Sequence, residues 1–403
     1  MFGKKLIAVA LLCAVGSVRA GLIESQWIGG AEGRWDAPEN WTPVVVPDNN
    51  DLLQFIVVIP GGDGPCAISL ARDYRVNAMI CHGQVTVRSQ HERHKLVFDL
   101  PAGLTNQGSL ELDDLSIVGN VANVADANLT FGTKGVALAG NLSNAKDALV
   151  QVDGIVELAG ATVTNDGEII VQNLGTLRIK QTAPESTMVN AGVLRFRGGT
   201  CAGFHTIVNA PKATMVGTGF LWARTSVVNR GTIMAFVGNL LVDSYGTIVN
   251  EGTMANLPGS TLNLYTKESD FTNTGRIVVQ QGGAVVFTSL PAKTCLINGP
   301  NGVISLKGGT VSASRISQSA QADFSGFGGI AADVAIDPSA RIRLTGTTNL
   351  VGNLTLPEKG ELTVNDGTVL VSGQTACDGT IRIVNGEFIP QGGFWGGGSI
   401  LSE

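Results

Sequence analysis

The chain has 403 residues and a formal net charge of −6, with 27 basic against 33 acidic side chains. This acidic balance argues against nucleic acid and anionic membrane surfaces as partners. Glycine is frequent, with 53 residues, whereas charged residues make up only 15% of the chain. The composition is therefore too apolar for a disordered protein and too rich in turn residues for a helical one, and we expect many short β-strands.

Residues 1–20 have the order of segments that is typical of a secretory signal peptide. Lys4 and Lys5 precede the apolar run Leu6–Val15, and Ala20 supplies a small residue at the expected cleavage position. We expect cleavage after Ala20 and a protein that is secreted, extracellular or held at the cell surface. No later apolar run approaches the 18 to 20 residues needed to cross a bilayer, so no membrane span is expected.

Residues 21–100 are predicted to form an N-terminal, Trp-rich capping module. Tryptophan recurs beside glycine and asparagine, and the module then reaches an apolar strand. Its motifs are Trp27-Ile28-Gly29-Gly30, Gly33-Arg34-Trp35, Asn40-Trp41, Pro47 and Asp48-Asn49-Asn50-Asp51 before Leu52–Phe55. Large apolar side chains beside glycines are suited to covering the open first coil of a solenoid.

These motifs resemble the opening repeat of autotransporter-passenger-like and other secreted, polymorphic-repeat β-helix proteins. The extracellular start of amnionless-type receptor subunits is also similar, at Asn40-Trp41 and from Pro47 to Phe55. The resemblance covers residues 27–55, a small part of the chain. It implies a secreted or surface-displayed β-helix, in some cases adhesive or scaffolding, and it does not imply catalysis.

Five cysteines follow the predicted signal peptide, so at least one has no partner within the chain. Cys66 and Cys81 are the only pair that is near in sequence, and they are the candidate disulfide. The pairing of Cys201, Cys295 and Cys377 stays open.

Residues 101–403 contain a repeat in which a short β-branched run ends in Asn, one residue follows, and then Gly. The full motif occurs at Asn106, Asn165, Asn190, Asn229, Asn250, Asn273 and Asn365, with degenerate copies at Asn209, Asn298 and Asn385. The spacing of about 22 residues matches one turn of a three-sided β-solenoid. The sequence therefore predicts an all-β fold, a right-handed parallel β-helix with an N-terminal capping module.

The repeated asparagines are expected to be structural. Asparagine tolerates the left-handed backbone conformation, and its amide can hydrogen-bond along a stack of equivalent turns. We therefore predict a ladder of turns at Asn165, Asn190, Asn229, Asn250, Asn273 and Asn365. The stretch Ser312–Ala340 lacks the motif, so an interruption or a longer excursion is expected there, with a short helix at Ser312–Ala320 as a candidate.

The sequence contains no complete catalytic motif. A polygalacturonase-like set would combine Asp-Asp and Arg-Ile-Lys with Gly-His-Gly, and only Asp113-Asp114 and Arg178-Ile179-Lys180 are present. His91 and His94 lack the spacing that places two imidazoles on a helix for zinc. We expect no catalytic, cofactor-binding or metal site and no cofactor. In a eukaryotic source the sequons at Asn40, Asn128, Asn141 and Asn353 would accept glycans.

The favoured function is that of a secreted or cell-surface β-helix with an adhesive, matrix or scaffolding role. One alternative is a polysaccharide-binding module that uses exposed aromatic residues such as Trp222, Tyr245 or Tyr265. The other is a carbohydrate-active, pectin-lyase-like enzyme on the same fold. A lateral groove with clustered carboxylates and a basic residue favours the enzyme, and a row of exposed rings favours the binding module. The expected partner is an extracellular polysaccharide or another surface protein.

Overall fold

The protein is described from a computed structural model that covers residues 21–50, 52–62, 64–90, 95–160, 162–180, 185–267, 269–289 and 295–403. The predicted signal peptide, residues 1–20, lies outside the described residues. His91 and His94 lie outside them as well.

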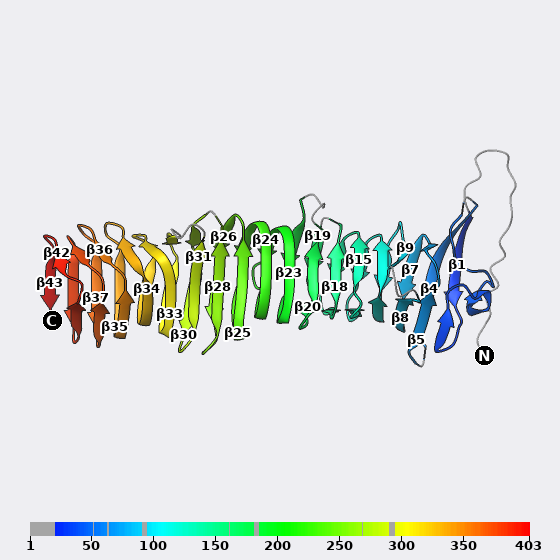
Figure 1. Cartoon of the computed structure of the whole chain (residues 1–403), viewed down its shortest axis with the longest axis horizontal. Helices are drawn as coiled ribbons and strands as arrows, with labels where there is room; N and C mark the ends of the chain where they lie inside the picture. Colours follow the sequence, from blue (N-terminus) through cyan, green and yellow to red (C-terminus); the bar gives the residue numbers. More distant parts are fainter. Residues whose placement is uncertain are drawn as a thin grey trace.

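The described chain winds into one long β-solenoid of about 16 parallel turns (Figure 1). The predicted fold class, an all-β parallel β-helix, is confirmed. At about 4.8 Å per turn the solenoid is on the order of 75 Å long. The strands stack in register from turn to turn and form three lateral sheets, which we call the first, second and third sheets.

Most strands belong to only one of the three sheets. Within each sheet, the strands follow one another in chain order. The first sheet contains β1 (Gly21–Trp27), β4 (Leu53–Ile59), β7 (Ala78–Cys81), β10 (Leu104–Asn106), β13 (Val121–Asn123), β16 (Leu142–Asn144), β19 (Thr162–Asn165), β22 (Thr187–Asn190), β26 (Thr247–Asn250), β29 (Phe271–Asn273), β32 (Cys295–Asn298), β36 (Leu354–Leu356), β39 (Thr375–Cys377) and β42 (Phe394–Trp395). The second sheet contains β2 (Glu32–Arg34), β5 (Cys66–Leu70), β8 (Gln84–Ser89), β11 (Ser109–Asp113), β14 (Asn128–Phe131), β17 (Leu149–Val152), β20 (Glu168–Val171), β27 (Thr253–Asn256), β30 (Arg276–Gln280), β37 (Glu361–Asn365), β40 (Thr380–Val384) and β43 (Ser399–Ser402). The third sheet contains β6 (Tyr74–Arg75), β9 (Leu96–Asp99), β12 (Leu115–Val118), β15 (Val136–Ala139), β18 (Ile155–Leu158), β21 (Thr176–Ile179), β28 (Thr261–Thr266), β31 (Ala284–Ser289), β38 (Thr368–Val371) and β41 (Glu387–Pro390).

Six longer strands bend around corners and contribute to more than one sheet. They are β23 (Val193–Asn209), β24 (Thr214–Asn229), β25 (Thr232–Ser244), β33 (Val303–Gln318), β34 (Asp323–Ile336) and β35 (Arg341–Val351). Glycine makes one such corner possible in β24. Gly217 has a φ of +133°, and a Cβ atom there would lie 2.0 Å from the carbonyl oxygen of Phe196. A side chain at this corner would collide with the turn before it.

The alternating pattern of the strands places one row of side chains inside the solenoid. In β28, for example, Leu262 and Leu264 are fully buried, while Asn263 and Tyr265 alternate with them and face outward. This period of two is the one expected for strands with one face in a core. The inward rows merge into a single apolar core that runs along the axis.

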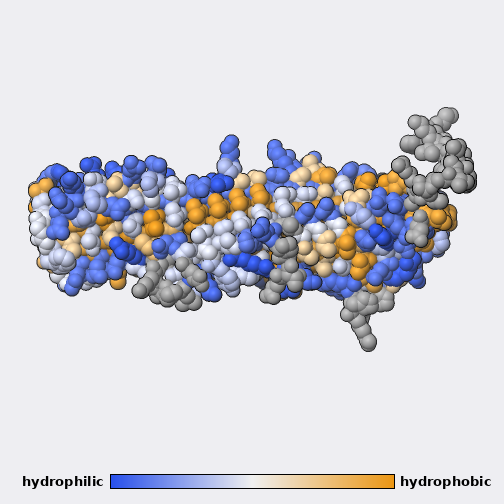
Figure 2. Space-filling view, turned by 90° about the horizontal axis from the view of Figure 1, so that it is seen from above, coloured by the Kyte–Doolittle hydropathy of each residue, from blue (hydrophilic) through white to orange (hydrophobic). Residues whose placement is uncertain are grey.

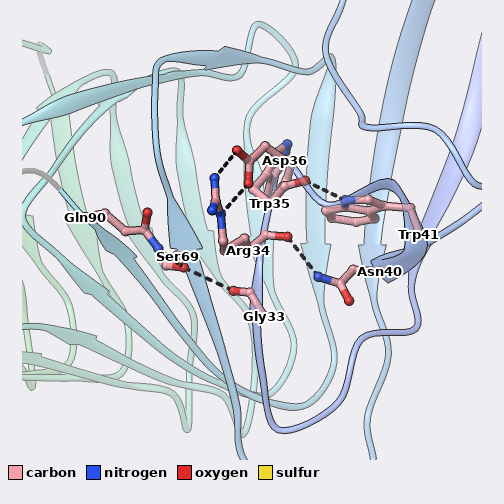
Figure 3. A network of polar contacts seen from close by, with 8 residues as sticks. All are labelled: Gly33, Arg34, Trp35, Asp36, Asn40, Trp41, Ser69 and Gln90. Carbon is pink, nitrogen blue, oxygen red and sulfur yellow. Dashed lines mark hydrogen bonds and ion pairs between the residues drawn. The ribbon is translucent and has the colours of Figure 1, made fainter.

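Three tryptophans pack together among the first strands of the chain, and Figure 3 shows two of them, Trp35 and Trp41. Strand β3 (Trp41–Thr42), which follows a short 3-10 helix at Pro38–Asn40, pairs antiparallel with β1, the first rung of the first sheet. The rings of Trp27 and Trp35 lie 4.9 and 4.6 Å from the ring of Trp41 in edge-on contacts. Trp41 Nε1 donates a hydrogen bond to the carbonyl oxygen of Trp35, so the buried indole is satisfied.

The solenoid continues without a break on both sides of residue 100, because β7, β8 and β9 pair with β10, β11 and β12. It also continues through residues 312–340, so the expected interruption and the candidate helix at Ser312–Ala320 are wrong. Gln318 takes the place of the repeated asparagine there, and its Oε1 accepts a hydrogen bond from Asn298 Nδ2. A glutamine amide provides the same pair of donor and acceptor, which the Asn-x-Gly search does not detect.

The outside of the solenoid is mixed in polarity. Figure 2 shows apolar residues in a band along much of one long side, with hydrophilic residues along both edges. Among the described residues there is no helix with the length and hydropathy that crossing a bilayer requires.

Candidate functional site

The middle of the third sheet carries an outward-facing column of charged and aromatic side chains. Successive turns place Glu157, Arg178, Ala202, Trp222, Asp243 and Tyr265 in register, one residue per turn. Each strand pairs with the next at the same position, so these side chains stack along the axis at intervals of about 4.8 Å. A carboxylate, a guanidinium and two aromatic rings therefore share one lateral face.

A groove opens in this face, and we call it the Trp222 groove. Its volume is about 520 Å³, and it is lined by Glu157, Arg178, Ile179, Lys180, Ala202, Gly203, Trp222 and Arg224. The hollow exists because Ala202 is small and lies between Arg178 and Trp222 in the column. Gly203 follows it with a φ of +83°, so the floor of the groove is nearly bare backbone.

The groove is electropositive. Three of its lining side chains are cationic, namely Arg178, Lys180 and Arg224, against the single carboxylate of Glu157. Arg178 Nη2 lies 2.9 Å from Glu157 Oε2 on the preceding turn, which holds the guanidinium in place along the column. The local charge is thus opposite to that of the whole chain, which is acidic.

Aromatic rings extend the groove along the axis. The ring of Tyr245 lies 5.3 Å from that of Trp222 at an interplanar angle of 62°, and Tyr245 is 50% exposed. Lys267 Nζ lies 5.3 Å from the centre of the Tyr245 ring, within cation–π range. Tyr265 lies on the turn beyond Asp243, so rings and charges alternate over neighbouring turns.

Asp243 is the most perturbed carboxyl on this face. It lies between Trp222 on one turn and Tyr265 on the next, and burial raises its pKa to about 6. Its Oδ1 atom is buried without a hydrogen-bond partner in the described part of the chain, and the same holds for Trp222 Nε1. Unsatisfied buried polar atoms and a shifted carboxyl beside a groove are features that mark candidate binding sites.

On the first sheet, the side-chain amides of most of the repeated asparagines form a row of hydrogen bonds from turn to turn. Asn165 Nδ2 donates to Asn190 Oδ1 at 2.7 Å, and Asn229 Nδ2 donates to Asn250 Oδ1 at 2.8 Å. Similar bonds connect the whole row, which consists of Asn106, Asn123, Asn144, Asn165, Asn190, Asn209, Asn229, Asn250, Asn273, Asn298 and Gln318. We call this row the amide ladder.

The ladder differs from the predicted set in its members. Asn365 ends β37 in the second sheet, where it pairs with Thr345 and Val384, so the structure places it outside the ladder. Asn123 and Asn144 belong to the ladder but were missed, because neither is followed two residues later by glycine. A run that ends in Asn at the repeat spacing would have been the better signal.

The remaining candidate residues are dispersed over the solenoid. Cys66 and Cys81 carry free thiols in the structure, and burial raises the pKa of both. Of the sequons, Asn128, Asn141 and Asn353 are exposed, whereas Asn40 is half-buried and its Nδ2 donates to the carbonyl oxygen of Arg34. No group of three or more potential metal-ligating side chains occurs in the described ranges.

The polygalacturonase-like fragments lie on different sheets. Asp113 ends β11 in the second sheet, where its Oδ1 accepts a hydrogen bond from the backbone N–H of Lys134. Arg178 and Lys180 line the Trp222 groove on the third sheet. Arg178 and Lys180, which belong to an incomplete polygalacturonase-like set in the sequence, are therefore part of the candidate site.

Fold and groove together define a parallel β-helix with an aromatic, electropositive groove on one lateral sheet. The sequence matches no known family profile and no curated protein, and the fold matches no solved structure. The function is therefore argued from the groove itself.

Proposed function

We propose that this protein is an exported β-helix that serves as a rigid scaffold and binds polysaccharide along its third sheet. The observation that carries the proposal is the grouping of Trp222, Tyr245 and Tyr265 on neighbouring turns beside a groove. Sugar rings present apolar C–H faces, which stack on aromatic rings, while their hydroxyl groups need polar partners. The Trp222 groove offers both.

Export and surface location are part of the proposal, and their support comes from sequence. Residues 1–20 have the basic, apolar and small-residue order of a signal peptide, and the opening motifs resemble those of secreted β-helix proteins. An elongated solenoid with one binding face is suited to holding a polymer at a fixed distance from an attachment point. This combination supports an adhesive or matrix role.

The test is retention of the purified chain, residues 21–403, on a panel of immobilised polysaccharides. The double variant Trp222→Ala/Tyr245→Ala is expected to bind its preferred polymer at least about tenfold more weakly, a loss of about 1.4 kcal/mol. The matched control is Trp395→Ala, because Trp395 is 58% exposed but lies at the far end of the first sheet. Equal losses in the two variants would contradict a binding role for the third sheet.

The same panel distinguishes binding from catalysis. Soluble polymer incubated with the protein is assayed for new reducing ends, which hydrolases and lyases both create, and for unsaturated ends, which only lyases create. A binding scaffold leaves both signals at the level of a buffer control. Release of either kind of end would replace the scaffold by a carbohydrate-active enzyme on the same fold.

A further inference from the structure

We infer that the polymer held by the Trp222 groove is an anionic polysaccharide, one whose sugars carry carboxylate or sulfate groups. This inference rests on the proposed function and adds the chemical class of the ligand. It follows from how charge is distributed around the ring of Trp222.

The cations of the groove are arranged to meet a ligand's negative groups. Arg178 and Lys180 lie on the turn two before Trp222, and Arg224 lies two residues after Trp222 on the same strand. Arginine binds carboxylate and sulfate-like groups through its planar fork of donors, and lysine adds a compact positive charge. A ligand in the hollow above Ala202 and Gly203 has cations on both sides.

Glu157 does not cancel this charge. Its carboxylate is paired with Arg178, and the lining residues as a set, with three cations and one carboxylate, keep a net positive charge. Lys267 adds a further cation beside Tyr245. A concentration of positive charge on an otherwise acidic protein attracts anions to this face and repels them elsewhere.

The spacing of the groups favours a polymer over a single sugar. Arg178 and Trp222 are separated by two turns, which is roughly 10 Å along the axis, and Tyr265 lies two turns further. A sugar stacked on Trp222 cannot also contact Tyr265. A chain of sugars that runs parallel to the solenoid axis can contact both rings, with its acidic groups at the cations and an uncharged part of the chain over Asp243 between the rings.

The test compares polymers that differ only in charge. Polygalacturonate is paired with its fully methyl-esterified form, and a sulfated glucan is paired with the unsulfated glucan. Binding of the wild-type chain to each is measured by titration at about 0.05 M and 0.5 M salt. We expect at least one anionic polymer to bind tenfold or more tightly than its neutral counterpart, and we expect high salt to weaken that binding.

Substitutions of the groove's cations test whether the preference for an anionic polymer arises at the Trp222 groove. Lys180→Gln/Arg224→Gln is expected to weaken binding of the anionic polymer at least tenfold, and Lys180→Arg alone is expected to retain it. The matched control, Lys307→Gln/Arg341→Gln, removes an exposed lysine and an exposed arginine from β33 and β35 and should leave binding unchanged. Thermal unfolding of each variant verifies that the solenoid is intact.

The outcomes separate this inference from the proposed function. Preference for an anionic polymer that is lost in the groove variant supports the inference. Binding of neutral polymers that depends on Trp222 but not on Lys180 and Arg224 overturns the inference and leaves the proposed function standing. Failure of the wild-type chain to bind any polymer overturns both. The carboxylated and sulfated pairs show which acidic group the groove accepts.

Discussion

At the scale of single residues, the buried amides explain how a polar side chain can be repeated through an apolar core. Each ladder asparagine is buried and donates along the axis to the next amide. Asn229 also donates to the carbonyl oxygen of Thr253 at 2.9 Å. A buried polar group is tolerated when its hydrogen bonds are made, and the stacking of turns makes them for the asparagines of the ladder.

Replacing one asparagine of the amide ladder should therefore take a hydrogen-bond partner from the amides on the two neighbouring turns. In Asn229→Ala, Asn209 Nδ2 loses an acceptor and Asn250 Oδ1 loses its donor. We expect a loss of about 2 to 3 kcal/mol in the free energy of unfolding, measured by urea denaturation. Asn365→Ala is the control, since Asn365 lies outside the ladder, and it should change stability by no more than about 0.5 kcal/mol. Similar losses in the two variants would count against the ladder as a stabilising feature.

Asp243 should make stability depend on pH in an unusual direction. Its pKa is about 6 in the folded chain, against an ordinary value of 3.8, because burial disfavours the carboxylate. Between these values the folded state binds more protons than the unfolded state, so the contribution of this group to stability falls as pH rises from about 4 to about 6. It stays low above that range.

The variant Asp243→Asn removes this dependence. It should be more stable than the wild type at pH 7 by about 1 kcal/mol, a value that allows for solvent screening of a group that is only half-buried. The difference should vanish near pH 4. Urea denaturation at several pH values measures it, with Asp126→Asn in an exposed turn as the control. A pH-independent difference would show that Asp243 is not the titrating group.

At the scale of secondary-structure elements, the corners determine whether a strand can continue from one sheet to the next. In β24 the chain turns at Gly217, whose φ of +133° is strained for any residue with a side chain. The approach of Phe196 from the preceding turn adds a steric requirement. Backbone conformation and close packing therefore select glycine together at this corner.

Gly217→Ala should be strongly destabilising. The added Cβ would lie 2.0 Å from the carbonyl oxygen of Phe196, so the turn must move. We expect a loss of more than about 2 kcal/mol in the free energy of unfolding, with a lower melting temperature. Gly397→Ala is the matched control, because a Cβ atom there meets nothing within 4 Å. That variant should melt within a degree or two of the wild type, and a comparable drop would contradict the steric explanation.

At the scale of the whole molecule, the solenoid joins segments that are far apart in sequence through one repeated geometry. Almost every strand contacts the turns directly before and after it, so the order along the chain is also the order along the axis. Which residues share a lateral surface therefore depends on the register between the strands of successive turns. Glu157 and Tyr265 are on the same face although more than a hundred residues separate them, since each occupies the same position in its turn.

The same geometry explains why the fold was predictable and parts of the ladder were not. Alternating apolar residues and a constant repeat spacing are local properties that a sequence displays directly. The place of Asn365, by contrast, depends on which of three similar strands in a turn it ends. That choice is made by pairing with Thr345 and Val384 on the neighbouring turns. Gln318 shows the converse, since a different residue can accept the ladder's hydrogen bond from Asn298 once the register places it there.

The sequence alone indicated that the chain is a β-solenoid, because a strand motif that recurs at the length of one coil is typical of stacked turns. Only the tertiary structure decided where a functional surface lies. The sequence offered Trp222 as a candidate aromatic residue but did not connect it with Arg178, and the two line one groove because the turns stack them in register on either side of the small side chain of Ala202. The repeat spacing is a local property of the sequence, whereas the register of the strands is set by contacts between turns.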